Sequence, residues 1–434
     1  MINIKNNIFI KSAIFLIIGG FITKIISMVI KIVLARLIGP EGMGIYMLIS
    51  PTFMLLMALA QLGFPVAISK IVAEDRRNNK NLVFSILPIS LTINLIIMLL
   101  VILSSAYIST NLLNEPRTYY ALMCIGFVLP FISISSILRG YFFGRQKMLP
   151  HVISNITEDL IRLICLIIGI PIFIKYGLEY AVAFVVLTNV ISEITSILVL
   201  FFFLPKNFKI TKKDLKPNIN NVKEIFNIGI PTTMSRLIGT IGYFFEPIIL
   251  TYTLIKTGYS NSYIVNEYGI INGFIMPLIL LPSFFTLAIS QALIPNISKA
   301  YVYKNYKYVK NKIKLAIVLS LLIGVPATII FETVPELPMK LIYNTTDGIE
   351  YIKILAPICL LHYIQSPLTA SLQAMGKAKE AMQGTLIGTI TRIFTLYILS
   401  SKHIGMWGLV WSSAINIIVV TTHQYLHVKK ALKK

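Results

Sequence analysis

Eight ionisable residues lie inside apolar stretches of about 20 residues, where an exposed charge would be expensive. The set comprises five bases and three acids: Lys24, Lys31, Arg162, Arg236, Arg392, Glu158, Glu193 and Glu246. Each would cost about 2.5–3.5 kcal/mol if it faced lipid at the centre of a bilayer. The total, on the order of 20 kcal/mol, exceeds a typical net folding stability. We therefore expect these side chains to face protein or water, and the surplus of bases suits an anionic ligand.

Spacing indicates which of these groups can act together. Lys24 and Lys31 stand seven residues apart, which is two helical turns, so they share one helix face. Glu158 and Arg162 stand four apart and can pair directly on a helix. Each of these residues also has a purely structural interpretation. The Glu158–Arg162 pair would brace its helix, Lys31 would extend its ammonium group to the membrane surface, and Glu193 would make a contact between helices.

A further cation, Arg139, begins the segment RGYFFGRQKM that ends another apolar stretch. Arg139 would anchor the cytoplasmic end of that helix at the membrane surface, or it would contact an anionic substrate that enters from the cytoplasm. The predicted substrate-binding cations are thus Lys24, Lys31, Arg139, Arg162, Arg236 and Arg392. The predicted coupling or ion-pair acids are Glu158, Glu193 and Glu246.

The elements that must position these residues follow from composition. Of 434 residues, 56% are hydrophobic and 13% are charged, with a mean hydropathy of +0.80, whereas soluble domains carry about 25% charge. We expect an all-α integral membrane protein with about twelve transmembrane helices. The twelve apolar spans are 12–35, 45–69, 82–107, 118–138, 153–174, 180–204, 225–252, 269–293, 313–331, 350–372, 381–400 and 405–427.

The net charge of +22 would suit a nucleic-acid-binding protein, and the RGYFF segment is similar to an RNA-binding pattern. With both termini in the cytoplasm, 27 of the 39 Lys and Arg residues fall in cytoplasmic loops and 7 in external loops. This asymmetry is a strong positive-inside signal, so the charge sets topology and no nucleic-acid partner is expected. Tyr141 to Phe143 would then lie at the headgroup level.

Short matches between the two halves indicate an internal repeat. Four of them lie 228 to 232 residues apart and align Arg162 with Arg392, and a fifth, at 212, aligns Lys24 with Arg236. Because six helices separate equivalent positions, the halves are parallel repeats, with a central cavity expected between two six-helix lobes. The predicted division is an N-lobe at 1–204, a basic cytoplasmic inter-lobe loop at 205–223 and a C-lobe at 224–434.

Enzymatic signatures are missing from the sequence. It contains no phosphate-binding loop, HExxH motif or nucleophile elbow. His423 and His427 stand four apart but have no acid or cysteine beside them, so no metal site is expected. We therefore expect neither an enzyme nor a bound cofactor.

Three segments of the first third carry a family resemblance: LARLIGPEGMGIYMLISP at 34–51, GFPVAISK at 63–70 and LRGYFFGRQKMLPHVISNITEDLIRLI at 138–164. They resemble the polysaccharide-transporter branch of the MOP flippase superfamily, and within it the sporulation proteins and lipid-linked oligosaccharide flippases. Lipid II flippases and MATE exporters are related groups. GIPTTMSRLIGTIGYFFEP at 229–247 is similar to the seventh helix of that family.

The resemblance implies a two-lobed, alternating-access flippase in the cytoplasmic membrane of a bacterium. Its substrate would be a polyprenyl-diphosphate-linked saccharide, a cell-envelope or spore-wall precursor, and its partners membrane lipids and envelope-synthesis enzymes. Coupling to H⁺, to Na⁺ or to the membrane potential alone stays open. The alternatives are a MATE-like cation-coupled multidrug exporter and a non-transporting membrane partner in envelope assembly.

Overall fold

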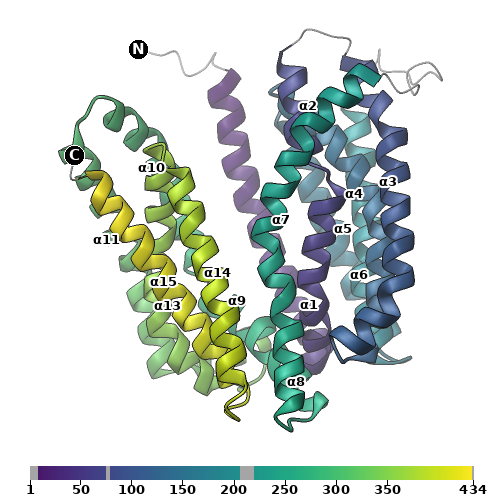
Figure 1. Ribbon diagram of the computed structural model, residues 1–434, viewed down its shortest axis with the longest axis vertical. Coiled ribbons are helices and arrows are strands. Elements are labelled where there is room, and N and C mark those ends of the chain that lie inside the picture. Colours follow the sequence, from purple (N-terminus) through teal and green to yellow (C-terminus); the bar gives the residue numbers. More distant parts are fainter. Residues whose placement is uncertain (1–7, 75–78, 206–218, 433–434) are drawn as a thin grey trace. The chain divides into compact units, whose positions relative to one another are not determined.

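The computed structural model describes residues 8–74, 79–205 and 219–432 (Figure 1). Within these ranges every regular element is helical and none is a strand, which confirms the all-α prediction. Most of the predicted inter-lobe loop, residues 206–218, lies outside the described ranges.

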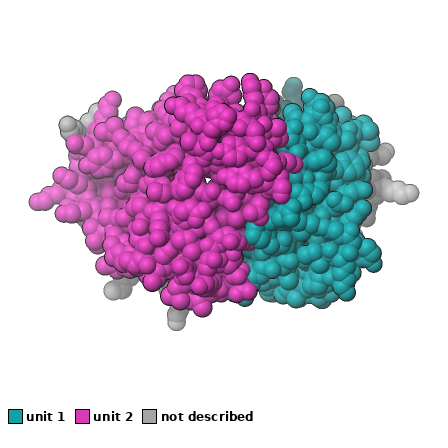
Figure 2. All heavy atoms as spheres, turned by 90° about the horizontal axis from the view of Figure 1, so that it is seen from below, with its two compact units in different colours: residues 1–241 teal, residues 242–434 magenta. Residues whose placement is uncertain are grey.

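The chain forms two compact units, Met1–Ile241 (unit 1) and Gly242–Lys434 (unit 2), which Figure 2 colours separately. The division falls inside helix α7 (Ile219–Lys256). The lobe boundary at 205–223 stays a prediction. The elements before α7 are α1 (Ile8–Ala60), α2 (Phe64–Ala73), α3 (Asn79–Tyr107), η2 (Ile108–Leu112), η3 (Pro116–Thr118), α4 (Tyr119–Gly144), α5 (Leu149–Phe173) and α6 (Leu178–Phe202).

Two breaks divide the first long stretch of helix. Gly39 has φ 66° and ψ −175°, so α1 is two helices that meet there, and Pro40 starts the second. A turn at residues 61–63 then separates the end of α1 from α2. Further along unit 1, α4 lies against α3 and α6, and α5 lies against α6 and α1.

Unit 2 begins within α7 and contains both short helices and helices of 20 or more residues. A bend of 50° separates residues 261–279 from α10. The elements after α7 are α8 (Asn261–Gly269), η4 (Ile270–Ile275), α9 (Met276–Ile279), α10 (Ser283–Val302), α11 (Tyr306–Thr333), α12 (Glu336–Tyr343), α13 (Ile349–Ala374), α14 (Ala378–Ser400) and α15 (Trp407–Leu432).

Eleven of the twelve predicted spans each overlap one described helical segment, if α1 is divided at Gly39 and the bent α8–α10 stretch counts once. The span predicted at 45–69 instead runs from the second part of α1 across the turn at residues 61–63 into α2. Of the described helices, five are long and apolar enough to cross a membrane unaided, and the bent pair would make a sixth. Helix α5 carries Glu158, Asp159 and Arg162 near its middle. Such a helix is stable in a membrane only where other helices cover its charges.

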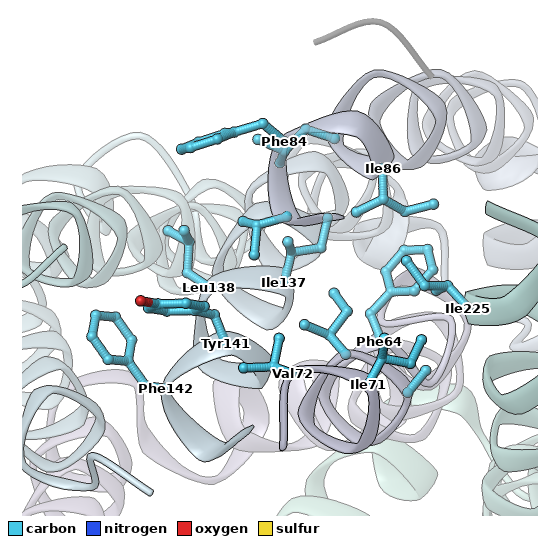
Figure 3. Close-up of a cluster of buried hydrophobic side chains, with 14 of the residues drawn as sticks. Phe64, Ile71, Val72, Phe84, Ile86, Ile137, Leu138, Tyr141, Phe142 and Ile225 are labelled. Atoms are coloured by element: carbon cyan, nitrogen blue, oxygen red, sulfur yellow. The ribbon is translucent and has the colours of Figure 1, made fainter. Parts of the chain in front are cut away.

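A hydrophobic core joins α2, α3, α4 and the start of α7 in unit 1 (Figure 3). Ile225 of α7 is fully buried there beside Phe64 of α2. Tyr141 and Phe142 are only 5% and 1% exposed in this core, so protein surrounds both rings, and their depth at the headgroup level stays a prediction. Their burial follows from the way α4 packs on α2: a Cβ on Gly144 would lie 2.6 Å from the Cβ of Val72.

Helix α7 touches the turn between α1 and α2 through backbone atoms. Gly63 in that turn has φ 65°, and a Cβ there would collide with the carbonyl oxygen of Gly229. A Cβ on Gly229 would lie 2.5 Å from the carbonyl oxygen of Leu62. Within unit 1, two glycines thus allow a close approach of α7 to the turn at residues 61–63, as small residues do between membrane helices.

We expect Gly229→Ala to lower the stability of the purified protein by about 1–3 kcal/mol, because the backbone of Leu62 must move. The matched control is Gly239→Ala on the same helix, where no atom lies within 4 Å of the added methyl group. The control should be neutral or slightly stabilising, since alanine favours helices. Thermal unfolding in detergent compares the two, and equal midpoints would show that the contact at Gly229 is loose.

Candidate functional site

Two arginines on different helices share one buried carboxylate in unit 1. Arg139 of α4 donates from Nη2 to Oε2 of Glu158 on α5, at 2.7 Å. Arg162, one turn further along α5, donates from Nη2 to Oε1 of Glu158, at 2.8 Å. The pairing that the four-residue spacing of Glu158 and Arg162 predicts is therefore present, and each carboxylate oxygen has its own guanidinium.

Helix α6 supplies hydroxyl groups to the same two arginines. Arg139 donates to Oγ of Ser196 at 3.0 Å, and Arg162 donates to Oγ of Ser192 at 3.1 Å. Both serines are fully buried. Polar contacts of this kind, together with small side chains, hold membrane helices together. Helices α4, α5 and α6 are thus joined by one polar network.

Two further acids surround the shared carboxylate. Asp159 lies 3.5 Å from Nη1 of Arg162 and accepts a 3.5 Å hydrogen bond from Ser27 of α1. Glu193 of α6 lies 3.8 Å from Nη2 of Arg139, and its side chain is 8% exposed. This cluster, the α4–α6 network, therefore holds three carboxylates and two guanidiniums.

Sequence reasoning missed part of this network. Asp159 is not among the predicted acids, although its position three residues before Arg162 on the same helix was a usable signal. The contacts of Ser27, Ser192 and Ser196 carry no such signal, because a serine inside an apolar span is common and depends on its neighbours. Glu193 was named among the acids, and the structure places it beside Arg139.

Unit 2 holds a second buried ion pair. Nη2 of Arg392 on α14 lies 2.9 Å from Oε2 of Glu246 on α7, and the two side chains are 14% and 7% exposed. The guanidinium of Arg392 also lies over the ring of Tyr243, 5.8 Å from its centre. The buried phenol of Tyr268 hydrogen-bonds Glu246. Thr389 and Asn416 complete the lining of a small pocket beside this pair.

The remaining three predicted cations are exposed. Lys24 and Lys31 lie on α1, and Arg236 lies on α7. In the described part of the chain none of the three has a carboxylate within 4 Å. Arg236 donates instead to the amide oxygen of Gln61, in the turn between α1 and α2. A neutral amide leaves the positive charge of Arg236 uncompensated.

The six predicted cations therefore fall into two groups. Arg139, Arg162 and Arg392 are held by carboxylates, and the repeat-related pair Arg162 and Arg392 is neutralised in both halves. Lys24, Lys31 and Arg236 keep their charge available for an anion. Their role in binding stays a prediction.

Comparison with known proteins places the chain in a family. Residues 9–301 match the family model described as "Polysaccharide biosynthesis protein", which covers more than half of the chain. The chain belongs to this family. Residues 240–398 also match the MatE family model. The predicted place in the polysaccharide-transporter branch of the MOP superfamily is confirmed.

Two relatives of this polysaccharide biosynthesis family member come from one bacterial strain. Stage V sporulation protein B of Bacillus subtilis (strain 168) is 37% identical and aligns with 98% of this chain and 84% of its own length. Lipid II flippase MurJ of the same strain is 21% identical over 95% of this chain and 81% of its own length.

The fold is that of a MOP-superfamily transporter. A structure described as the inward-facing conformation of a multidrug resistance MATE family transporter matches with a TM-score of 0.75 and 18% identity. The match covers 95% of this chain and 94% of that one. With the apolar helices described above, it confirms a multi-pass protein of the cell membrane.

We expect Glu246→Gln and Arg392→Gln each to destabilise the protein by about 3–5 kcal/mol, because each leaves a buried charge without its partner. The double variant should lose much less than the sum of the two. Unfolding free energies of the four proteins give the coupling energy. The exposed pair Glu336–Lys340, with side chains 62% and 60% exposed, is the control and should show a coupling of about 0–1 kcal/mol. Additive effects at Glu246 and Arg392 would contradict a working ion pair.

Proposed function

We propose that this protein is a flippase that moves a polyprenyl-diphosphate-linked saccharide outward across the cytoplasmic membrane. The observation that carries the proposal is a set of exposed cations on predicted spans that have no carboxylate within 4 Å among the described residues, namely Lys24, Lys31 and Arg236. Such charges persist in a membrane protein when an anionic ligand or water compensates them. The protein would act as a transporter rather than as an enzyme.

The relatives support this class of substrate. One is named a lipid II flippase, another a sporulation protein, and the matching family is one of polysaccharide biosynthesis. A saccharide carried on a lipid diphosphate has an anionic group at the membrane surface and a tail that stays in lipid. The substrate would be a precursor of the cell envelope or of the spore wall.

The geometry of the exposed cations suits a diphosphate. Lys24 and Lys31 lie two turns apart on one face of α1, about 10 Å along the helix axis. Arg236 donates a hydrogen bond to the amide oxygen of Gln61, which a phosphate oxygen can replace. Arginine offers a phosphate two parallel hydrogen bonds, whereas each lysine acts as a point charge.

The ionic groups of unit 1 bear on the coupling ion. The α4–α6 network contains Glu158, Asp159 and Glu193 against Arg139 and Arg162. An excess carboxylate in a buried site is costly unless a proton or a cation neutralises it. This excess supports coupling to H⁺ or Na⁺ in addition to the membrane potential.

The second candidate is a cation-coupled multidrug exporter of the MATE type. The fold match and the MatE family model over residues 240–398 favour it. It requires carboxylates to dominate the substrate site, and the α4–α6 network has that balance. The exposed Lys24, Lys31 and Arg236 oppose it, because they would repel a cationic drug. A non-transporting role in envelope assembly is the third candidate, and a failure of every transport assay would favour it.

We expect Lys24→Gln/Arg236→Gln to slow flipping of a fluorescent polyprenyl-diphosphate saccharide at least about tenfold, since each lost charge-assisted hydrogen bond removes about 1.5–3 kcal/mol. The assay uses proteoliposomes and an impermeant quencher that reports label in the outer leaflet. The matched control is Lys340→Gln/Lys402→Gln, which removes two exposed charges of unit 2. Full flipping by the first variant would sink the proposal. Efflux of a cationic dye by both proteins would favour the MATE alternative.

The direction of the membrane potential should govern the rate. A diphosphate carries about two negative charges, and outward movement of each gains about 2.3 kcal/mol per 100 mV, inside negative. Imposing that potential with a potassium gradient and valinomycin should accelerate outward flipping, and reversing the gradient should slow it. An opposite dependence would mean that the transported charge is positive.

A further inference from the structure

A dense group of lysines and tyrosines surrounds the turn between α10 and α11. We call it the Lys–Tyr surface. It comprises Lys299, Tyr301, Tyr303, Lys304, Tyr306, Lys307, Tyr308, Lys310, Lys312 and Lys314. The sequence contains neither aspartate nor glutamate between Glu267 and Glu332. The six lysines therefore have no compensating acid nearby in sequence.

The core of unit 2 fixes the direction of these lysines. Val309, Ile313 and Ala316 of α11 are buried in a hydrophobic cluster that includes the ends of α10, α13 and α15. Lys307, Lys310 and Lys314 lie three and four residues apart on another side of the same helix and are exposed. The first turns of α11 thus present a row of ammonium groups away from the core.

Apolar and aromatic groups stand beside the charges. Val302 and Tyr303, at the turn, are 75% and 74% exposed. Tyr308 is 40% exposed, and Nζ of Lys312 lies 5.3 Å from the centre of its ring. Lysines mixed with exposed tyrosine and aliphatic groups are typical of a segment at a membrane interface.

Few acidic side chains compensate the positive charge at this end of unit 2. None of the six lysines has a carboxylate within 4 Å in the described ranges. The turn between α10 and α11 lies at the same end of unit 2 as the C-terminus, where Lys429 and Lys430 are also exposed (Figure 1). Glu380 of α14 already pairs with Lys377, at 3.2 Å.

We propose that the Lys–Tyr surface binds anionic phospholipid headgroups of the cytoplasmic leaflet. Helix α11 contains a stretch long and apolar enough to cross the membrane, and its four lysines all lie before that stretch or at its start, at residues 307–314. Its lysines therefore stand at the level of the phosphates, with Val302 and Tyr303 able to enter the interface. Charge complementarity selects anionic lipids, because basic clusters next to membrane helices attract anionic surfaces. This site is separate from Lys24, Lys31 and Arg236 and does not depend on which substrate is flipped.

Native mass spectrometry of the purified full-length chain with added phosphatidylglycerol tests the proposal. The variant is Lys307→Gln/Lys310→Gln/Lys314→Gln, and the matched control is Lys256→Gln/Lys340→Gln/Lys402→Gln, which removes three exposed charges elsewhere in unit 2. The variant should bind phosphatidylglycerol about 100-fold more weakly than wild type, and the control should be unchanged. Phosphatidylcholine should bind weakly to all three proteins. Equal phosphatidylglycerol binding by variant and wild type would overturn the proposal and leave the lysines a role in topology alone.

Two further measurements keep the test decisive. The charge-retaining variant Lys307→Arg/Lys310→Arg/Lys314→Arg should bind phosphatidylglycerol as wild type does, even if the glutamine variant fails to fold. Binding to wild type should also weaken as salt rises. Salt-insensitive binding would overturn the proposal. So would loss of polyprenyl diphosphate binding in the glutamine variant with phosphatidylglycerol binding intact, because the occupant would then be the substrate.

Discussion

The cost of an uncompensated charge in a bilayer governs how this chain is built. Glu158 accepts hydrogen bonds from Arg139 of α4 and Arg162 of α5. Together with Asp159 and Glu193 it compensates both positive charges. The serines of α6 each accept one further hydrogen bond from these guanidiniums. Without Glu158, each arginine would lose its shortest carboxylate contact, and Arg139 and Arg162 would no longer share an acceptor. The same constraint appears in unit 2, where the carboxylate of Glu246 compensates the positive charge of Arg392.

This pairing separates structural cations from those available to a ligand. Arg139, Arg162 and Arg392 each have a carboxylate within 3 Å. Lys24, Lys31 and Arg236 have none within 4 Å among the described residues, and Arg236 donates a hydrogen bond to the amide oxygen of Gln61. A chain that neutralises three of its membrane-embedded cations but leaves three others exposed is consistent with selection for an anionic ligand. The glycine contact between α7 and the turn at residues 61–63 holds Arg236 close to Gln61.

Much of the fold could be predicted because membrane spans leave a simple signal. Runs of about 20 apolar residues located the helical segments, and a four-residue spacing located the pair Glu158–Arg162. Contacts between distant segments left no comparable signal. Arg139 and Glu158 are 19 residues apart and lie on different helices, so their contact depends on how α4 and α5 pack. Tyr141 and Phe142 were assigned to the headgroup level because aromatic residues favour span ends, yet α2 covers them. The sequence alone does not reveal such cover.

The central claim is that the exposed cations recognise a lipid diphosphate. The most direct test is the affinity of the purified protein for a polyprenyl-diphosphate saccharide, compared with the uncharged polyprenol of the same chain length. We predict that the diphosphate binds at least about tenfold more tightly, and that Lys24→Gln/Arg236→Gln removes this difference. Equal affinity for the two lipids in the wild-type protein would contradict the account.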